Sequence, residues 1–285
     1  MNNFFSVIIP TFKRKLKLQR AILSVIKQTY KEWEIIIVDN NSNDGTKELV
    51  KSFNDNRIRL FNINNNGVIA ASRNLGIKKS KGNYLSFLDS DDWWHKDKLS
   101  LTNNHASEGK KFLYHDMYLN SKHKILTRKT GYCRVLSDNP FLDLKINGPA
   151  FATSSVSIEK KLFLENSLFN ESKNYIAWED YDAWLRISRV YKDLFLIKKT
   201  LGYINIENDN YLDSEKTIKN IIEFKKNYID DEKLPSWCLY SIIKSNFKLK
   251  KFEEVNYFMK KIKLRELKFK QILLLLSYKF KLFFN

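Results

Sequence analysis

The sequence Tyr84-Leu85-Ser86-Phe87-Leu88-Asp89-Ser90-Asp91-Asp92 joins an apolar run directly to a cluster of carboxylates. A buried strand followed by such a cluster places acidic side chains where the strand leaves a sheet. Their oxygens suit the hard cations Mg²⁺ and Mn²⁺, and Mg²⁺ is commonly held by one or two carboxylates together with substrate phosphates. The stretch therefore predicts a cation site shared with a diphosphate. The alternative is a solvated turn or a helix cap.

Upstream of this stretch, short apolar strands alternate with segments of helical periodicity. Strands are expected at residues 4–9, 34–38, 58–63 and 84–88, and helices at 16–28, 46–53 (capped by Thr46) and 68–79. This alternation predicts a mostly parallel sheet covered by helices on both faces. Because ligands bind such sheets at the carboxyl ends of the strands, Pro10-Thr11, Asp39 and residues 89–92 are expected to meet in one crevice.

Five motifs in this order resemble the inverting GT-A glycosyltransferases of family 2, which use nucleotide-diphospho-sugars. The agreement in order and spacing extends over residues 1–205. The motifs are SVIIPT (6–11), EIIIVDN (34–40), NG with SRNLGI (66–67 and 72–77), FLDSDD (87–92) and WEDYD (178–182).

The resemblance implies an α/β GT-A nucleotide-sugar-binding fold with a mostly parallel central sheet flanked by helices, plus a basic α-helical C-terminal appendage. Residues 1–210 are expected to form the catalytic domain, with a nucleotide-binding half at 1–95 and an acceptor-binding half at 96–210. Residues 211–285 are expected to be helical. The length of 285 residues suits one main domain with an appendage.

The resemblance also implies a donor site. Asp39 is expected to accept a hydrogen bond from the base, although an Asx turn or a helix cap is the alternative. Arg73 is expected to reach the nucleotide or the acidic cluster with its planar guanidinium, unless it forms an ion pair that only supports Asp89. Ser90 is expected to contact the nucleotide sugar. Three further residues are expected to line the uracil and ribose pocket: Pro10, Thr11 and Phe12.

Within the acidic cluster, the resemblance implies that Asp91 is the direct ligand of Mn²⁺ or Mg²⁺. Asp89 is expected to contact the ribose and the metal with its water, and Asp92 to assist from farther away. A cation between the phosphates stabilises the charge that develops on the departing UDP.

The expected general base lies in the motif at residues 178–182. Family resemblance favours Asp180, with Glu179 in reserve as the base or as a group that orients the acceptor. Because carboxylates are also stabilised at helix N-termini, capping is the alternative for both. Contacts with the donor sugar or the acceptor are expected from Thr153, Ser154 and Trp178.

One departure from the family concerns a third metal ligand. Many relatives carry Arg and His after the strand at 201–206, whereas this chain reads Tyr203-Ile204-Asn205-Ile206-Glu207-Asn208. Glu207 or the backbone is the remaining candidate. The histidines lack ligand spacing and are expected at the surface or around the site: His95, His105, His115 and His123. Cys133 and Cys238 are too few and too distant for a disulfide framework, which indicates a reducing cytosol.

The charge is concentrated near the C-terminus. Residues 236–285 hold 12 Lys+Arg and 3 Glu, a net of +9 and half of the total +18. Helices are expected at 237–249, 252–262 and 265–284, and the lysines from Lys260 to Lys270 alternate with apolar residues as in a basic amphipathic surface element. The functional interpretation is adhesion to an anionic leaflet, at about 1 kcal/mol per basic residue. The alternative is a packed appendage with solvated lysines.

Together these features predict a metal-dependent inverting hexosyltransferase. The expected donor is a UDP-sugar, with UDP-glucose or UDP-galactose ahead of UDP-GlcNAc. The expected acceptor is a hydroxyl of a bacterial surface glycan or an undecaprenyl-diphosphate-linked sugar, as in polysaccharide, lipopolysaccharide or O-antigen biosynthesis, and the new linkage is β. The sequence shows no signal peptide and no apolar run long enough to span a bilayer, so a cytoplasmic protein peripheral to the inner face of the membrane is expected.

Other classes of protein fit less well. A catalytically silent sugar-nucleotide binder remains the main alternative. A nucleic-acid-binding protein would be non-specific at most, because no recognised nucleic-acid-binding motif is present. A D-x-D phosphatase is disfavoured because Trp93 stands where that motif has Thr or Val. A nicotinamide enzyme is disfavoured because Pro-Thr-Phe-Lys-Arg, and no glycine-rich turn, follows the first strand.

Overall fold

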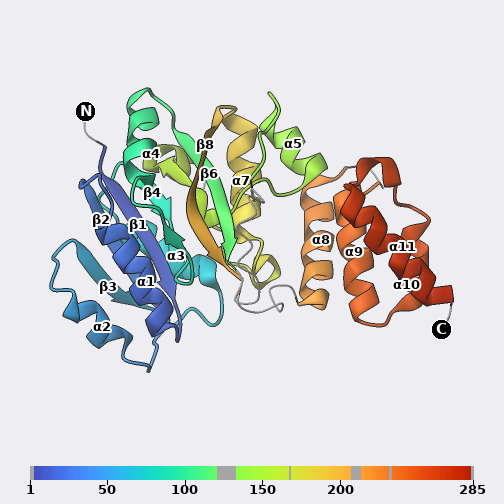
Figure 1. The fold of residues 1–285 in the computed structure, drawn as a ribbon, viewed down its shortest axis with the longest axis horizontal. Coiled ribbons are helices and arrows are strands. Elements are labelled where there is room, and N and C mark those ends of the chain that lie inside the picture. The colour runs from blue at the N-terminus through green and yellow to red at the C-terminus, as the bar shows by residue number, and fades with distance from the viewer. Residues whose placement is uncertain (1–2, 121–132, 167, 207–212, 231–232, 284–285) are drawn as a thin grey trace. The chain divides into compact units, whose positions relative to one another are not determined.

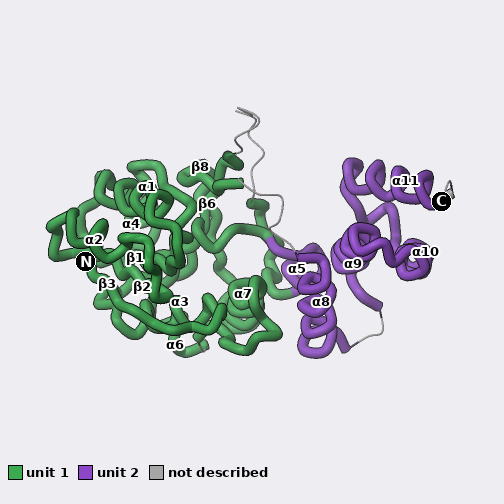
Figure 2. The backbone as a smooth tube through the Cα atoms, turned by 90° about the horizontal axis from the view of Figure 1, so that it is seen from below, with its two compact units in different colours: residues 1–141, 150–207 green, residues 142–149, 208–285 purple. Residues whose placement is uncertain are grey.

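The computed structural model describes residues 3–120, 133–166, 168–206, 213–230 and 233–283. The chain forms two compact units (Figure 2). The first contains residues 1–141 and 150–207, and the second contains residues 142–149 and 208–285. The short segment 142–149, expected in the acceptor-binding half, thus belongs to the helical unit.

The first unit is built on one eight-stranded sheet in the order β3-β2-β1-β4-β7-β6-β8-β5 (Figure 1). Neighbours in β3-β2-β1-β4 and the pair β6-β8 are parallel, and the other three pairings are antiparallel. The predicted mostly parallel sheet is therefore confirmed. The strands are β1 (Phe5–Thr11), β2 (Trp33–Asp39), β3 (Ile58–Asn62), β4 (Tyr84–Phe87), β5 (Trp93–Trp94), β6 (Phe112–Asn120), β7 (Ser157–Glu159) and β8 (Leu194–Asn205).

The predicted helices of this unit are present, with ends shifted by at most two residues. Thr46 does not cap its helix as predicted. The preceding Gly45 occupies the cap position with a φ of 81°, and the carboxylate of Asp44 accepts from the backbone N–H of Thr46 at 3.1 Å and its hydroxyl at 2.7 Å. The helices are α1 (Lys15–Ile26), α2 (Thr46–Ser52), α3 (Ile69–Lys79), α4 (Lys98–Ser107), α6 (Lys160–Glu165) and α7 (Glu179–Val190).

Helices α1 and α3 pack on opposite faces of β1 because successive strand side chains alternate. Val7 and Ile9 join the core that contains Ile22 of α1. Ile8 points the other way, toward α3, where a Cβ on Gly76 would lie 2.6 Å from its side chain. Glycine at this position lets the helix that carries Arg73 approach the sheet closely.

An aromatic cluster fixes α7 against the second half of the sheet. Trp184 of α7 lies 6.0 Å from Phe87, 5.3 Å from Phe112 and 5.9 Å from Phe169, measured between ring centroids. These side chains are all buried. Edge-on aromatic packing of this kind adds to the stabilisation from burial, so the N-terminus of α7 has a fixed place.

The second unit is helical, as predicted. Its small core contains Ile243, Val255, Leu275 and Tyr278. The expected helix at 265–284 begins later, because a 3₁₀ turn at Leu264–Glu266 precedes it. In the described part of the chain, no helix combines the length and apolar character needed to cross a membrane. The helices are α8 (Ser214–Tyr228), α9 (Ser236–Lys248), α10 (Phe252–Met259) and α11 (Phe269–Phe283), together with most of α5 (Pro140–Asn147), since residues 142–149 belong to this unit.

Candidate active site

The predicted meeting of three motifs at one sheet edge is confirmed. Thr11, the last residue of β1, is the register partner of Asp39, the last residue of β2. Strand β4 pairs with β1 on the other side and ends at Phe87, so the chain passes into Asp89 at the same edge. The parallel pairing of β2, β1 and β4 therefore gathers the acidic groups.

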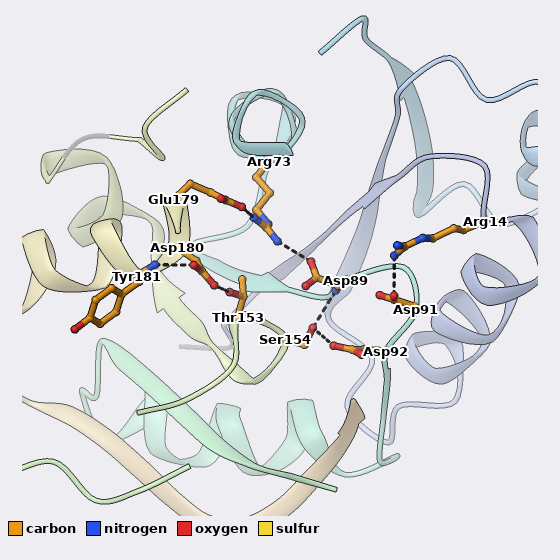
Figure 3. Close-up of polar contacts among 10 residues, drawn as sticks. All are labelled: Arg14, Arg73, Asp89, Asp91, Asp92, Thr153, Ser154, Glu179, Asp180 and Tyr181. Atoms are coloured by element: carbon orange, nitrogen blue, oxygen red, sulfur yellow. Dashed lines mark hydrogen bonds and ion pairs between the residues drawn. The ribbon is translucent and has the colours of Figure 1, made fainter. Parts of the chain in front are cut away.

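Arg73 connects this edge to the start of α7 (Figure 3). Its guanidinium donates to Glu179 Oε1 at 2.5 Å and to Asp89 Oδ1 at 2.8 Å. Burial opposes the positive charge, but the facing carboxylates outweigh burial and hold the pKa of Arg73 above its ordinary value. This is the ion pair that the alternative interpretation of Arg73 expected, and it extends to Glu179 as well. Its contact with the nucleotide stays a prediction.

Ser154 links Asp92, the last residue of the acidic cluster, to Asp89, the first. The Ser154 hydroxyl donates to Asp92 Oδ2 at 2.6 Å and accepts from the Asp89 N–H at 3.1 Å. The backbone N–H of Asn205 donates to Asp92 Oδ1 at 3.1 Å. Burial, with the charge of Asp89, raises the pKa of Asp92 well above its ordinary value. The Ser154 hydroxyl is engaged in these two bonds, and its expected contact with a sugar stays a prediction.

Two arginines that the sequence analysis did not single out hold Asp91. Arg14 lies 2.7 Å from Asp91 Oδ2, and Arg20 donates to the Asp91 carbonyl oxygen at 2.7 Å while stacking over Trp93. The signal was available in the sequence, because Arg14 follows Pro10-Thr11 in the loop that leaves the same sheet edge. Ser90, between the acidic residues, is buried.

Asp180 lies beside Thr153, whose hydroxyl donates to Asp180 Oδ2. The other oxygen of Asp180 accepts from the Tyr181 N–H at 2.7 Å. Asp180 is partly exposed, whereas Glu179 is buried and paired with Arg73. Burial raises the pKa of Glu179, against the opposing effect of Arg73. Trp178 is partly exposed at the start of α7, and its expected contact with a sugar stays a prediction.

The nucleotide-binding candidates on the first two strands occupy the same edge. Asp39 accepts from the Ser42 N–H at 3.0 Å and from its hydroxyl at 2.5 Å, so its carboxylate organises the loop after β2 through residue i+3, one residue farther than in an Asx turn. Phe12 is exposed, whereas Pro10 and Thr11 are buried. Base recognition by these residues stays a prediction.

Of the two places expected for the histidines, the surface is excluded for His115, which is buried on β6. Burial and the nearby Lys98 lower its pKa to about 3. Lys98 is itself buried, its amine donates to Ser86 and Ser157, and burial lowers its pKa well below the ordinary value. His95 and His105 are partly or fully exposed, and both His123 and Glu207 lie outside the described residues.

The donor atoms fit a cation that is shared with a diphosphate. Among residues that the structure describes, no three His, Cys, Asp or Glu side chains are grouped to hold a metal by themselves. Asp89 and Asp91 nevertheless place hard oxygen atoms at the sheet edge, and the Asp89 side chain is about one-third exposed. Two carboxylates completed by substrate phosphates are the usual environment of Mg²⁺.

The fold resembles a solved nucleotide-bound structure. Residues 1–349 of Staphylococcus aureus TarS, solved in complex with UDP, match with a TM-score of 0.60 at 19% sequence identity. The match covers 92% of this chain and 76% of the TarS chain. The order of the strands and the match to TarS together assign this fold to the GT-A class.

The chain belongs to glycosyl transferase family 2, whose model matches residues 6–163. A glycosyltransferase of Rickettsia felis is 34% identical over 242 residues, which are 83% of this chain and 39% of that protein. An Escherichia coli UDP-Glc:alpha-D-GlcNAc-diphosphoundecaprenol beta-1,3-glucosyltransferase is 31% identical over 182 residues, which are 64% of this chain and 69% of that protein. The matched part of the chain thus spans well under half the length of the Rickettsia relative.

Proposed function

We propose that this protein transfers a hexose from a UDP-sugar, with UDP-glucose or UDP-galactose favoured, to a hydroxyl of a glycan or an undecaprenyl-diphosphate-linked sugar, forming a β-linkage. The observation that carries the proposal is the double ion pair of Arg73. It ties the acidic cluster, at the expected leaving-group side, to the start of α7, which carries the expected base. The name of the Escherichia coli relative supports this donor, acceptor and linkage.

The donor side of the reaction is assigned to the sheet edge. Pro10, Thr11 and Phe12 would line the uracil and ribose, and Asp39 would accept from the base. Asp89 and Asp91 would hold Mn²⁺ or Mg²⁺ beside the diphosphate. When bound, the cation supplies a Lewis acid that stabilises charge on the leaving UDP.

The acceptor side is assigned to Asp180. Its carboxylate is partly exposed and is held by Thr153, whereas the Glu179 carboxylate is buried against Arg73. Asp180 would remove the proton from the acceptor hydroxyl as that oxygen attacks the anomeric carbon opposite the UDP. The new carbon–oxygen bond forms while the bond to the diphosphate breaks, so no enzyme nucleophile is needed. A positioned base contributes about 10² to 10⁴ in rate.

A lipid-linked acceptor implies work at a membrane surface. The basic C-terminal segment supports a location on the inner face of the cytoplasmic membrane, because anionic lipids attract lysine and arginine. In this arrangement the lipid-diphosphate acceptor and the enzyme would share one surface.

The experiment is a panel of UDP-sugars incubated with short-chain lipid-diphosphate sugars, with Mn²⁺, Mg²⁺ or a chelator. Release of UDP together with a glycosylated product is expected from one donor, and only with the metal. Donor binding without turnover across the panel would instead support a silent sugar-nucleotide binder.

A further inference from the structure

Helix α11 exposes a stripe of large apolar side chains. The fractional exposures are 73% for Phe269, 49% for Leu273, 51% for Leu276 and 66% for Phe280. The spacing of four, three and four residues places these side chains on one side of the helix. Scattered exposed apolar residues are ordinary, but an aligned set on one helix marks an interaction surface.

The stripe is not the face that holds α11 in its unit. Leu275 and Tyr278, on the other side of the helix, are buried in the core with Ile243 and Val255. The Tyr278 ring stacks on Phe247 of α9 with centroids 3.8 Å apart. The inner face therefore packs within the unit, and Phe269, Leu273 and Leu276 present their side chains to a partner outside it.

The charge around the stripe indicates the chemistry of that partner. At about 100° per residue, Lys270 and Lys281 fall on one flank of the stripe and Lys279 on the other. Between residues 260 and 281 the chain carries eight Lys or Arg and one Glu. An apolar crest between basic flanks is complementary to a surface with an apolar interior and anionic headgroups.

We propose that α11 lies in the interface of an anionic lipid bilayer, with Phe269, Leu273 and Leu276 inserted below the headgroups and the flanking lysines on the phosphates. This inference deepens the proposed function, since it rests on the proposed location at the membrane. It also changes the expected contact: the apolar stripe inserts, and the lysines from 260 to 270 only supplement it with long-range attraction.

The test is co-sedimentation of the full chain with vesicles of phosphatidylcholine alone or with added phosphatidylglycerol. We expect Leu273→Gln/Leu276→Gln to lower the partition coefficient on the anionic vesicles by at least about tenfold, because two leucines no longer leave water. Glutamine preserves helix propensity, and circular dichroism checks the fold. The matched control is Leu164→Gln/Ile222→Gln, at exposures of 47% and 59%, which should bind as the wild type does.

The depth to which α11 enters the bilayer is measured separately with the Phe269→Trp variant. The added tryptophan emission should shift to shorter wavelength and be quenched by lipids brominated on the acyl chain. If the lysines alone adhere to the vesicles, that emission would stay unquenched and salt would abolish the vesicle binding. This result would overturn insertion. Self-association of the wild type in sedimentation velocity, lost in Leu273→Gln/Leu276→Gln without any vesicle binding, would show that a second copy covers the stripe.

The two proposals fail in different ways. Transfer to a water-soluble acceptor should be unchanged by the double substitution in α11, and vesicle binding requires neither donor nor acceptor. Normal transfer without vesicle binding would refute only the membrane inference. Vesicle binding without transfer would refute only the proposed function.

Discussion

At the scale of single residues, arginine side chains occupy the carboxylates that are expected to bind the metal. Asp91, the expected metal ligand, is held by Arg14, and Asp89 is held by Arg73. These two contacts differ, because the Arg14 side chain is about half-exposed whereas the Arg73 side chain is buried. Because the Arg14 side chain is in contact with solvent, a cation can displace Arg14 from Asp91 more readily than it can displace the buried Arg73 from Asp89.

The first prediction concerns this competition. In the absence of donor, Arg14→Gln should bind Mn²⁺ about two- to fivefold more tightly than the wild type, because the competing guanidinium is gone. Electron paramagnetic resonance of free Mn²⁺ measures this without any turnover. Asp91→Ala should lose the binding, and a chelator should stop transfer by the wild type. If Asp91→Ala keeps normal Mn²⁺ affinity, Asp91 is not the ligand.

The second prediction concerns the base. Asp180→Asn keeps the shape of the side chain, and its amide group can still contact Thr153 and the Tyr181 N–H. Asparagine does not accept the acceptor proton, so kcat should fall by about 10² or more while UDP affinity stays within a few-fold. Single-turnover kinetics measures the rate of transfer, and titration with UDP measures the affinity for UDP. A near-normal kcat would move the role to Glu179.

At the scale of elements, the site depends on how α3 packs on β1 and how α7 packs against β4. Gly76 brings α3 onto the sheet, and Trp184 fixes α7 within the aromatic cluster. Arg73 and Glu179 join the two helices where they approach the edge. Removing one partner of a buried ion pair leaves the other charge unpaired, which is costlier than removing both.

The third prediction follows from that asymmetry. Arg73→Met should lower the free energy of unfolding by about 3–5 kcal/mol, because Glu179 is then buried without its partner. Arg73→Met/Glu179→Met should recover part of this loss. Urea denaturation of the wild type, both single variants and the double variant forms the cycle. Additive effects of the two substitutions would contradict a direct coupling between these side chains.

At the scale of the whole molecule, the concentrated positive charge and the buried ionisable groups lie in different units. The C-terminal segment carries half of the net positive charge, at the surface of the helical unit. The first unit instead buries two ionisable groups, Lys98 and His115, whose charged forms are disfavoured in the folded state. These buried groups link the stability of that unit to pH.

The fourth prediction concerns this pH dependence. Folding lowers the pKa of His115 from 6.5 to about 3, so the unfolded chain binds more protons between these values. The contribution of His115 is full above pH 6.5 and is lost at about 1.4 kcal/mol per unit as the pH falls toward 3. His115→Asn retains a donor for the Asp116 carbonyl but does not titrate, so its stability should fall less steeply.

Urea unfolding followed by tryptophan fluorescence measures the slope for the wild type and the His115→Asn variant between pH 7 and pH 5. The signal reports mainly the first unit, which contains Trp33, Trp93, Trp94, Trp178 and Trp184. Parallel slopes for the two proteins would show that His115 does not carry the dependence.

The sequence by itself determined the first four strands, the helices between them and the family motifs. Runs such as Ile35–Val38 and the periodicity of α1 specify local structure, because they depend on neighbours along the chain. Parallel pairing then follows from alternation, and with it the gathering of Asp39 and Asp89 at one edge. These features were predictable because each rests on short-range patterning or on a general rule of sheet topology.

Only the tertiary structure decided which polar groups satisfy one another. Arg73 reaches Glu179 across 106 positions, and Arg14 reaches Asp91 across 77. The burial of His115 likewise depends on Lys98 and the strands around it. In α11 the sequence has apolar residues on several sides, so packing against α9 and α10 alone determined which side is buried and left Phe269, Leu273 and Leu276 outside. Such contacts depend on the path of the whole chain, and no local pattern encodes that path.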